Sequence, residues 1–297
     1  MLACEVERGA GVFDDLEFDA GTGDASPADT VTDGSTGSGL QDASGYWLLL
    51  AEDHKCINSD IVASVENLIW STYLVRIEEV PSETGAFLEQ TLSLCGQSLT
   101  PLPLMLKTVV PPAIPAGLPA RQVKALLGTR GLGASYATEE FVDLWGAEAL
   151  GRGQELPTSA EHPNIVDHDA DEEPGVTLSV VDGTGEEFCR LQVVQRTTIQ
   201  FVGQYDGEGQ IAGRMDSVGE KSILSSTNPI CENGDLGPSS LAGRFAMRKI
   251  ADLDAIETFD TNDNGTLDCL EIDLEAERAR LRFERSEPDD AACTVEL

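Results

Sequence analysis

Twelve residues near the C-terminus, 260–271, carry oxygen-bearing side chains at an alternating spacing. These side chains stand first, third, fifth, ninth and twelfth in the stretch, at Asp260, Asn262, Asn264, Asp268 and Glu271. The sixth residue is a glycine, which permits a sharp bend that a side chain would obstruct. Calcium is a hard cation that takes about six to eight oxygen ligands, so a loop with this spacing can surround one ion. The stretch therefore predicts a calcium site, and the alternative is a solvated Asp/Asn turn.

The pattern resembles the loop of an EF-hand, a calcium motif in which a loop joins two helices, and the resemblance spans residues 252–284. The resemblance assigns the ligand oxygens to the side chains of Asp260, Asn262, Asn264, Asp268 (directly or through water) and Glu271, and to the backbone carbonyl of Thr266. Glu271 is expected to give two oxygens. Calcium is the cofactor that follows from this resemblance.

An EF-hand also needs a helix on each side of its loop. Leu253, Ile256 and Phe259 are spaced to share one face of a helix before the loop. A second apolar face follows the loop, formed by Ile272, Ala276, Ala279 and Phe283. No second loop of this pattern follows, although these motifs usually occur in pairs. We therefore expect a lone helix–loop–helix module over residues 251–297.

A second acidic spacing occurs at Asp167, Asp169 and Asp171. It resembles the opening of the calcium loops in thrombospondin type 3 and dockerin-type repeats. Glu172 replaces the glycine expected after the third acid, and no acid stands at the closing position. A weaker calcium site is one interpretation and a solvated acidic loop is the other. A zinc site at His168 is disfavoured because the chain has only 3 histidines, without companion spacing.

No motif of an enzyme is present. The sequence lacks a Gly-x-Ser-x-Gly elbow, a phosphate-binding loop, a dinucleotide fingerprint and a His-Glu-x-x-His helix. Glu139 with Glu140, or the Glu-Asp-His cluster at 52–54, offers an acid–base pair, but any acidic protein offers such choices. A hydrolase with an unrecognised site therefore remains an alternative, without assigned residues.

The charge of the chain limits its partners. Among 297 residues, 53 are acidic and 19 are basic, which gives a formal net charge of -34. Such a surface repels nucleic acid and anionic membranes and concentrates cations. The alternative explanation of this charge is solubility or adaptation to salt. No apolar run is long enough for a membrane-spanning helix.

Of the 7 cysteines, six form a spaced, even set that favours disulfides and an oxidising compartment, and reduced, buried cysteines are the alternative. Six of them fall into three sequential pairs, and the simplest grouping joins Cys56 to Cys95, Cys189 to Cys231, and Cys269 to Cys293. The seventh, Cys4, follows Met1-Leu-Ala, and alanine before cysteine is what a bacterial lipoprotein processing site requires. The chain thus partly resembles an uncharacterised secreted bacterial lipoprotein. That resemblance implies a lipid anchor on Cys4 and an extracytoplasmic location.

The remaining chain predicts a mainly β fold. Residues 1–44 are rich in Gly, Ser, Thr and Asp and predict a disordered acidic tether. Residues 45–250 contain short strand-like segments joined by Asp-Gly and Gly-rich turns, typical of an antiparallel sandwich or barrel. The two stretches 45–110 and 176–250 are candidates for two halves of this domain. Within residues 138–145, alternation of Phe141, Asp143 and Trp145 favours a strand.

Three functions remain open on the sequence. The first is a non-enzymatic, secreted or cell-envelope protein with a structural calcium ion in its C-terminal loop. The second is a β-barrel that binds a small ligand in its interior, again with structural calcium. The third is the hydrolase without a recognised site. No protein partner is indicated.

Overall fold

The computed structural model of the chain describes residues 42–57, 65–82, 85–101, 106–128, 132–151, 153–206, 209–232, 241–289 and Cys293. The tether predicted over 1–44 lies outside these residues except for 42–44, and so does the lipidation site predicted at Cys4. Both stay predictions. All the described residues belong to one compact unit.

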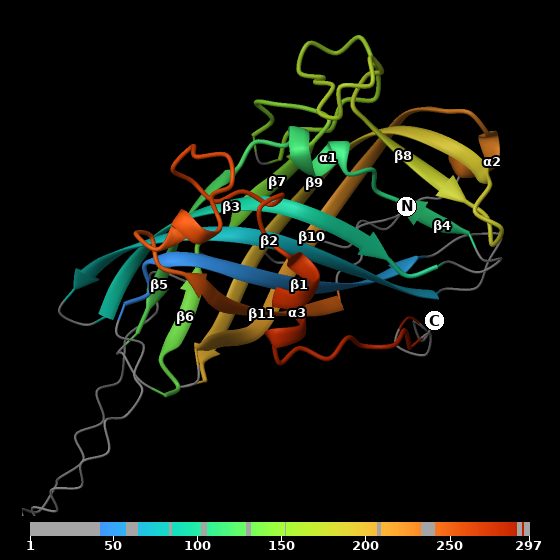
Figure 1. The fold of residues 1–297 in the computed structure, drawn as a ribbon. Coiled ribbons are helices and arrows are strands. Elements are labelled where there is room, and N and C mark those ends of the chain that lie inside the picture. Colours follow the sequence, from blue (N-terminus) through green and yellow to red (C-terminus); the bar gives the residue numbers. More distant parts are fainter. Residues whose placement is uncertain are drawn as a thin grey trace, which may run out of the picture. The chain divides into compact units, whose positions relative to one another are not determined.

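The described residues form a mainly antiparallel β fold, as the sequence predicts (Figure 1). The strands are β1 (Gly45–Ile57), β2 (Val65–Ser82), β3 (Gly85–Leu99), β4 (Lys107–Val109), β5 (Arg121–Leu127), β6 (Ser135–Thr138), β7 (Phe141–Trp145), β8 (Val176–Val181), β9 (Glu187–Tyr205), β10 (Gln210–Ser226) and β11 (Leu241–Ala251). Pairing runs in the order β10-β11-β1-β2-β3-β5-β6-β9, and β10 also pairs with β9. This last pairing closes these strands into a ring.

Two local predictions are confirmed in the strands. The alternation of Phe141, Asp143 and Trp145 places all three side chains in the interior from β7. The Asp-Gly-Thr-Gly sequence forms the turn between β8 and β9, where Asp182 and Glu186 pair and Gly185 has a φ of 87°. A glycine adopts this left-handed backbone without a steric penalty.

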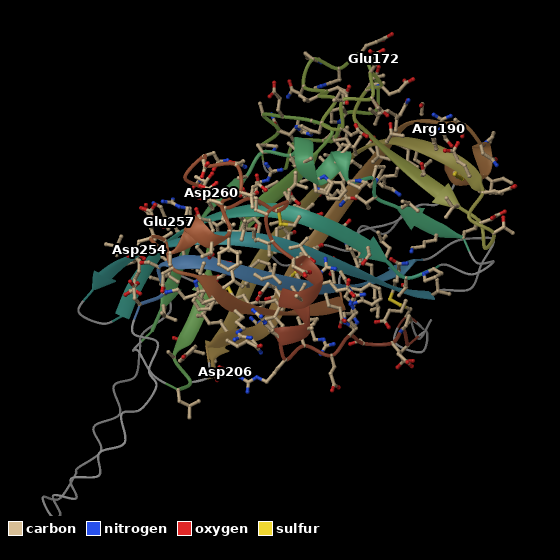
Figure 2. All side chains as sticks on the ribbon, viewed as in Figure 1. Glu172, Arg190, Asp206, Asp254, Glu257 and Asp260 are labelled. Atoms are coloured by element: carbon tan, nitrogen blue, oxygen red, sulfur yellow. A yellow bond between two sulfur atoms is a disulfide. The ribbon has the colours of Figure 1, made fainter. Side chains whose placement is uncertain are left out.

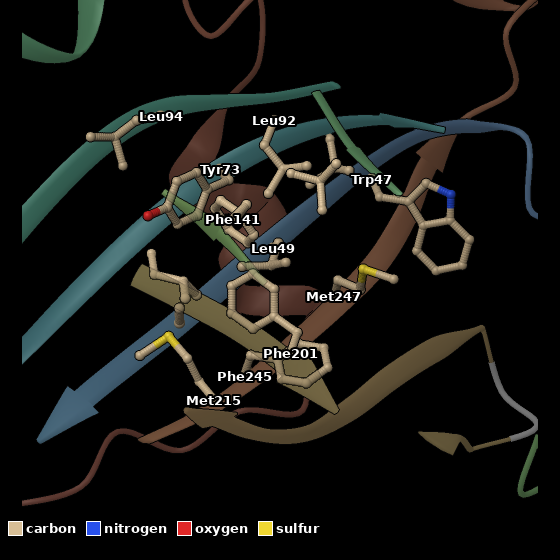
Figure 3. Packing of buried hydrophobic residues seen from close by; sticks show 14 of the residues in the cluster. Trp47, Leu49, Tyr73, Leu92, Leu94, Phe141, Phe201, Met215, Phe245 and Met247 are labelled. Carbon is tan, nitrogen blue, oxygen red and sulfur yellow. The ribbon is translucent and has the colours of Figure 1, made fainter. Parts of the chain in front are cut away.

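The main core fills the inside of the ring (Figure 3). The rings of Phe201 and Phe245 lie 4.9 Å apart between centroids, and Phe141 lies 5.9 Å from Phe201. Trp47 on β1 and Met247 on β11 belong to the same cluster. Side chains on alternate positions of each strand point inward, which is why the core draws on every part of the ring.

β1 is buried on both faces. Trp47 and Leu49 face the main core. Leu48 and Leu50 lie in another cluster with Leu281, which belongs to the part of the chain after β11, called the C-terminal segment below. The uninterrupted apolar run of β1 follows from this double burial, since a strand exposed on one face would alternate with polar residues. The C-terminal segment therefore covers the outer face of the sheet.

The described helical elements are short. They are α1 (Ala113–Gly117), α2 (Pro229–Glu232), the 3-10 turn η2 (Ile256–Thr258) and α3 (Leu274–Arg280). The helix predicted before the 260–271 loop is only the turn η2, and the helix after the loop begins at Leu274, three residues after Glu271. A segment this short is not helical by itself, so packing decides its conformation. Here Ile256 packs on Tyr46 and Leu74 of the sheet.

Three disulfides form, joining Cys56 to Cys293, Cys95 to Cys269, and Cys189 to Cys231. The prediction for Cys189 and Cys231 is confirmed, and the other two sequential pairings are wrong. β2 lies between the strands that carry Cys56 and Cys95. Two strand spacings are roughly 10 Å, which exceeds the roughly 4.4–6.8 Å between Cα atoms that a disulfide tolerates. Both cysteines instead bind the C-terminal segment, and the three bonds indicate an extracytoplasmic protein.

Candidate metal centres

The first candidate is the loop 260–271, which curls around the carboxylate of its first residue. Asp260 Oδ1 accepts the backbone N–H of Asn264 at 3.1 Å, and Oδ2 accepts that of Gly265 at 2.7 Å. The fourth and sixth residues, Asp263 and Gly265, have left-handed backbones with φ of 57° and 76°. The bend expected at Gly265 is therefore present, and the loop folds back over Asp260.

Glu271 closes the same loop from its other end. Its Oε1 accepts the backbone N–H groups of Thr261 at 2.7 Å and Asn262 at 3.1 Å, and its Oε2 accepts that of Asp268 at 3.1 Å. Desolvation acts to raise the pKa of Glu271, but these hydrogen bonds outweigh it and lower the pKa below the usual value. These hydrogen bonds thus favour the charged carboxylate where the two ends of the loop meet.

The sheet and a disulfide position this loop. Leu267 is buried at the eighth loop position, and its backbone N–H donates to the hydroxyl of Tyr46 at 3.3 Å. Cys269, at the tenth position, is bonded to Cys95 of β3. Aliphatic packing and one covalent bond therefore fix the second half of the loop, while the first half is exposed.

The loop brings together only part of the predicted ligand set. Asn264 Oδ1 accepts the N–H of Thr266 at 2.8 Å, and Asn262 Nδ2 reaches Asp268 Oδ2 at 3.4 Å. No three acidic side chains of the loop have ligand oxygens within 4.8 Å of one another. Asp260 Oδ1 and Oδ2 and Glu271 Oε2 each accept one backbone N–H, which leaves each of these oxygens a lone pair for a cation.

The second candidate, Asp167 to Glu172, repeats the hydrogen bonding of the first. Asp167 Oδ1 accepts the backbone N–H of Asp171 at 3.3 Å, and Oδ2 accepts that of Glu172 at 2.9 Å. These donors stand four and five residues after the aspartate, as in the first loop. Ala170 and Glu172 have φ of 55° and 70°, so the fourth and sixth positions are again left-handed. Figure 2 labels Glu172 here and Asp260 on the first loop.

Three carboxylates converge in the second loop. Asp167, Asp169 and Asp171 each place one oxygen within 4.8 Å of the others, and within the described ranges this is the one such group of acidic, histidine or cysteine side chains. Asp169 is 8% exposed. Burial, together with the charge of Asp171, raises the pKa of Asp169 above its ordinary value. The three carboxylates thus lie closer together than the incomplete sequence motif leads one to expect.

His168 stands between these carboxylates but has a separate role. Its Nδ1 accepts the backbone N–H of Gly146 at 3.0 Å, which ties the loop to the end of β7. Burial lowers the pKa of His168, with a further contribution from the charge of Arg121. The converging group contains carboxylate oxygens only, a ligand set that suits calcium better than zinc.

The acid–base candidates of the sequence belong to structural contacts. Glu139 Oε1 accepts the backbone N–H of Lys124 at 2.9 Å. Glu52, on the outer face of β1, accepts bonds from Arg244 Nε at 2.7 Å and from the N–H of Ser286 at 2.9 Å. His54 Nε2 lies 3.1 Å from the same carboxylate. The sequence does not reveal this cluster as an anchor for the C-terminal segment, because Arg244 and Ser286 lie more than 190 residues away from Glu52.

A hollow lies at one end of the ring, where the small-ligand alternative would place its site. It consists of two adjoining hollows, both of which Lys55, Ile69, Gln97, Trp145 and Gln195 help to line. The smaller holds about 30 Å³ and the larger about 90 Å³. Ligand pockets typically measure roughly 300–1,000 Å³. In the described part of the chain, the hollow is therefore small for a ligand site.

No family model matches the chain, and the searches of curated proteins and of solved structures found no match either. Within the residues that the structure describes, no helix has the length and apolar character needed to cross a membrane.

Proposed function

We propose that the protein is a non-enzymatic calcium-binding protein in which an ion in the 260–271 loop fixes the C-terminal segment on the β domain. One observation carries the proposal. The two end carboxylates, Asp260 and Glu271, both turn onto backbone amides of the loop that they delimit. The loop is thereby folded back onto two of the carboxylates that the EF-hand resemblance assigns to calcium. The short flanks η2 and α3 depart from a complete EF-hand, so the proposal rests on the loop.

Electrostatics supports an ion at this place. The twelve residues hold four acidic side chains (Asp260, Asp263, Asp268 and Glu271) and no basic one. Like charges held together in one loop repel each other. A divalent cation between them attracts each carboxylate and offsets that repulsion. Outside the cytoplasm calcium is abundant, and a site with a dissociation constant of roughly 10⁻⁴–10⁻³ M is filled.

The structural role follows from where the loop is attached. Its second half is joined to β3 through Cys269 and packs on Tyr46 of β1 through Leu267. An ion that holds the first half to Glu271 stiffens the connection between β11 and α3. The segment after α3 then continues across the sheet to Glu52 and Cys293. We further propose a secreted or cell-envelope location, with a lipid anchor on Cys4.

Calcium calorimetry and thermal unfolding of the full chain, first stripped with chelator, test the proposal. A ligand that binds only the folded state raises the melting temperature. Glu271→Gln removes the charge that closes the loop and should abolish binding there. Glu257→Gln is the matched control, because Glu257 is exposed and lies just before the loop. The idea fails if the Glu271→Gln protein and the Glu257→Gln protein bind calcium equally.

A further inference from the structure

We propose that Asp167, Asp169 and Asp171 form a second calcium site, separate from the 260–271 loop. Their ligand oxygens already lie within 4.8 Å of one another without rearrangement. Carboxylate oxygens from residues one, three and five of a loop are the ligands that a hard cation takes, and backbone carbonyls or water complete its shell. This site does not depend on the first one, since it uses other residues.

An unpartnered buried oxygen gives the independent indication of a ligand. Asp169 is 8% exposed, its Oδ2 accepts the backbone N–H of Thr177 at 2.9 Å, and its Oδ1 is buried without any hydrogen-bond partner. The hydroxyl of Thr177 is also buried without a partner. Buried carboxylate oxygens are normally bonded, and an orphan one calls for an ion or another ligand. A calcium ion among the three carboxylates supplies that partner.

The charge of the cluster supports the same ligand. Within the described residues, no lysine or arginine forms an ion pair with Asp167, Asp169 or Asp171. Backbone N–H groups donate to all three carboxylates, and Asp167 and Asp169 also lie within hydrogen-bond reach of each other. Three carboxylates at this separation repel each other. A cation relieves that repulsion, whereas an anion or an apolar ligand does not.

The site has a definite structural position. The cluster lies within the connection between β7 and β8, in which Ala147 and Ile165 form an isolated bridge and the backbone N–H of Gly146 donates to His168. Asp169 connects to the start of β8 through Thr177. An ion here would fix this connection against the start of β8. The same backbone conformation as in residues 260–265, with Glu172 in place of glycine, is consistent with this role.

Calcium calorimetry on the chelator-stripped full chain tests the site. We expect two binding events in the unmodified protein, and one after Asp169→Asn, which keeps the size of the side chain and removes its charge. Asp254→Asn is the matched control, since Asp254 is exposed and lies outside both loops. It should keep both events. The proposal is overturned if Asp169→Asn binds as many ions as Asp254→Asn.

A second variant covers the case in which Asp169→Asn does not fold. Asp171→Asn changes an exposed member of the same cluster, and it should weaken the second event at least tenfold with an unchanged near-ultraviolet circular dichroism spectrum. Equal affinity in a folded Asp171→Asn protein also overturns the site. Failure of the first loop is distinguishable, because Glu271→Gln would then bind as the unmodified protein does while Asp169→Asn loses an ion. Protease cleavage within residues 146–175 should slow with calcium only where Asp169 is intact.

Discussion

The two acidic loops have the same backbone conformation but differ in sequence and in the burial of their carboxylates. In both, the first aspartate accepts the N–H groups four and five residues later, and the fourth and sixth residues are left-handed. The first loop has the glycine and the closing glutamate of a complete motif and is mostly exposed. The second has Glu172 at the glycine position and a buried Asp169. Motif completeness and convergence of carboxylates are therefore separate properties.

The difference separates what the sequence pattern tells about a loop from what the burial of its side chains tells. In the first loop, the end carboxylates are satisfied by the loop's own amides, so the sequence pattern predicts the shape of the loop. In the second, packing against β8 removes one carboxylate from solvent and leaves an oxygen without a partner. Burial of Asp169 is thus the observation behind the second proposed calcium site, which the incomplete pattern alone supports only weakly.

The largest expected difference in calcium affinity between the loops comes from removing the Cys95–Cys269 disulfide, which is attached to the first loop and not to the second. Cys95→Ser with Cys269→Ser opens a connection of 174 residues, and on the chain-entropy account this costs on the order of 3–5 kcal/mol of unfolding free energy. The first loop should then lose calcium affinity while the Asp167–Asp171 site keeps it. Urea unfolding and calcium calorimetry measure the two effects. The control, Cys189→Ser with Cys231→Ser, should lower stability and leave both calcium events unchanged, and equal calcium binding in the two double variants would contradict the prediction.

The anchor of the C-terminal segment at Glu52 should respond to acid. Burial acts to raise the pKa of Glu52, but bonds from Arg244, Ser286 and Trp70 lower it from 4.5 to about 2. A lowered carboxyl pKa contributes stability above the unfolded pKa, and this contribution is lost as pH falls from about 4.5 to 2. Glu52→Gln should cost roughly 2–3 kcal/mol at neutral pH, less than for a fully buried pair because Arg244 reaches solvent.

Denaturant unfolding across this pH range measures the contribution of Glu52. The stability difference between the unmodified protein and Glu52→Gln should shrink as pH falls from 4.5 to 2. Glu257→Gln, an exposed substitution of the same kind, should show little difference at any pH. A gap between wild type and Glu52→Gln that stays constant with pH would exclude the charge as its cause. The second loop does not contact Glu52, so calcium binding there should be unaffected at neutral pH.

The sequence correctly predicts structure where the determining interactions are local. The Asp182-Gly-Thr-Gly turn, the alternation in β7 and the bend at Gly265 each depend on a few neighbouring residues. It fails where the partner comes from the sheet topology. Cys56 and Cys95 are separated by β2 and bind the distant C-terminal segment, and the helix predicted before the first loop yields to packing of Ile256 on Tyr46. Burial of Asp169 is likewise a tertiary property.

The smallest expected effect tests the backbone that the loops share. Gly265→Ala should cost about 1 kcal/mol. Among the described residues, apart from its chain neighbours, no atom lies within 4 Å of the added Cβ, so only the left-handed backbone is penalised. Glu172→Gly should change the calcium-free stability in the opposite direction by about 0.5–1 kcal/mol, since it relieves a non-glycine residue at a φ of 70°. Denaturant unfolding of the chelated protein measures both, with Gly209→Ala as a matched control at a φ of 89° and with open space around it. If Glu172→Gly destabilises the chelated protein, then contacts of the Glu172 side chain, rather than a strained copy of the first loop, hold residues 167–172 in their conformation.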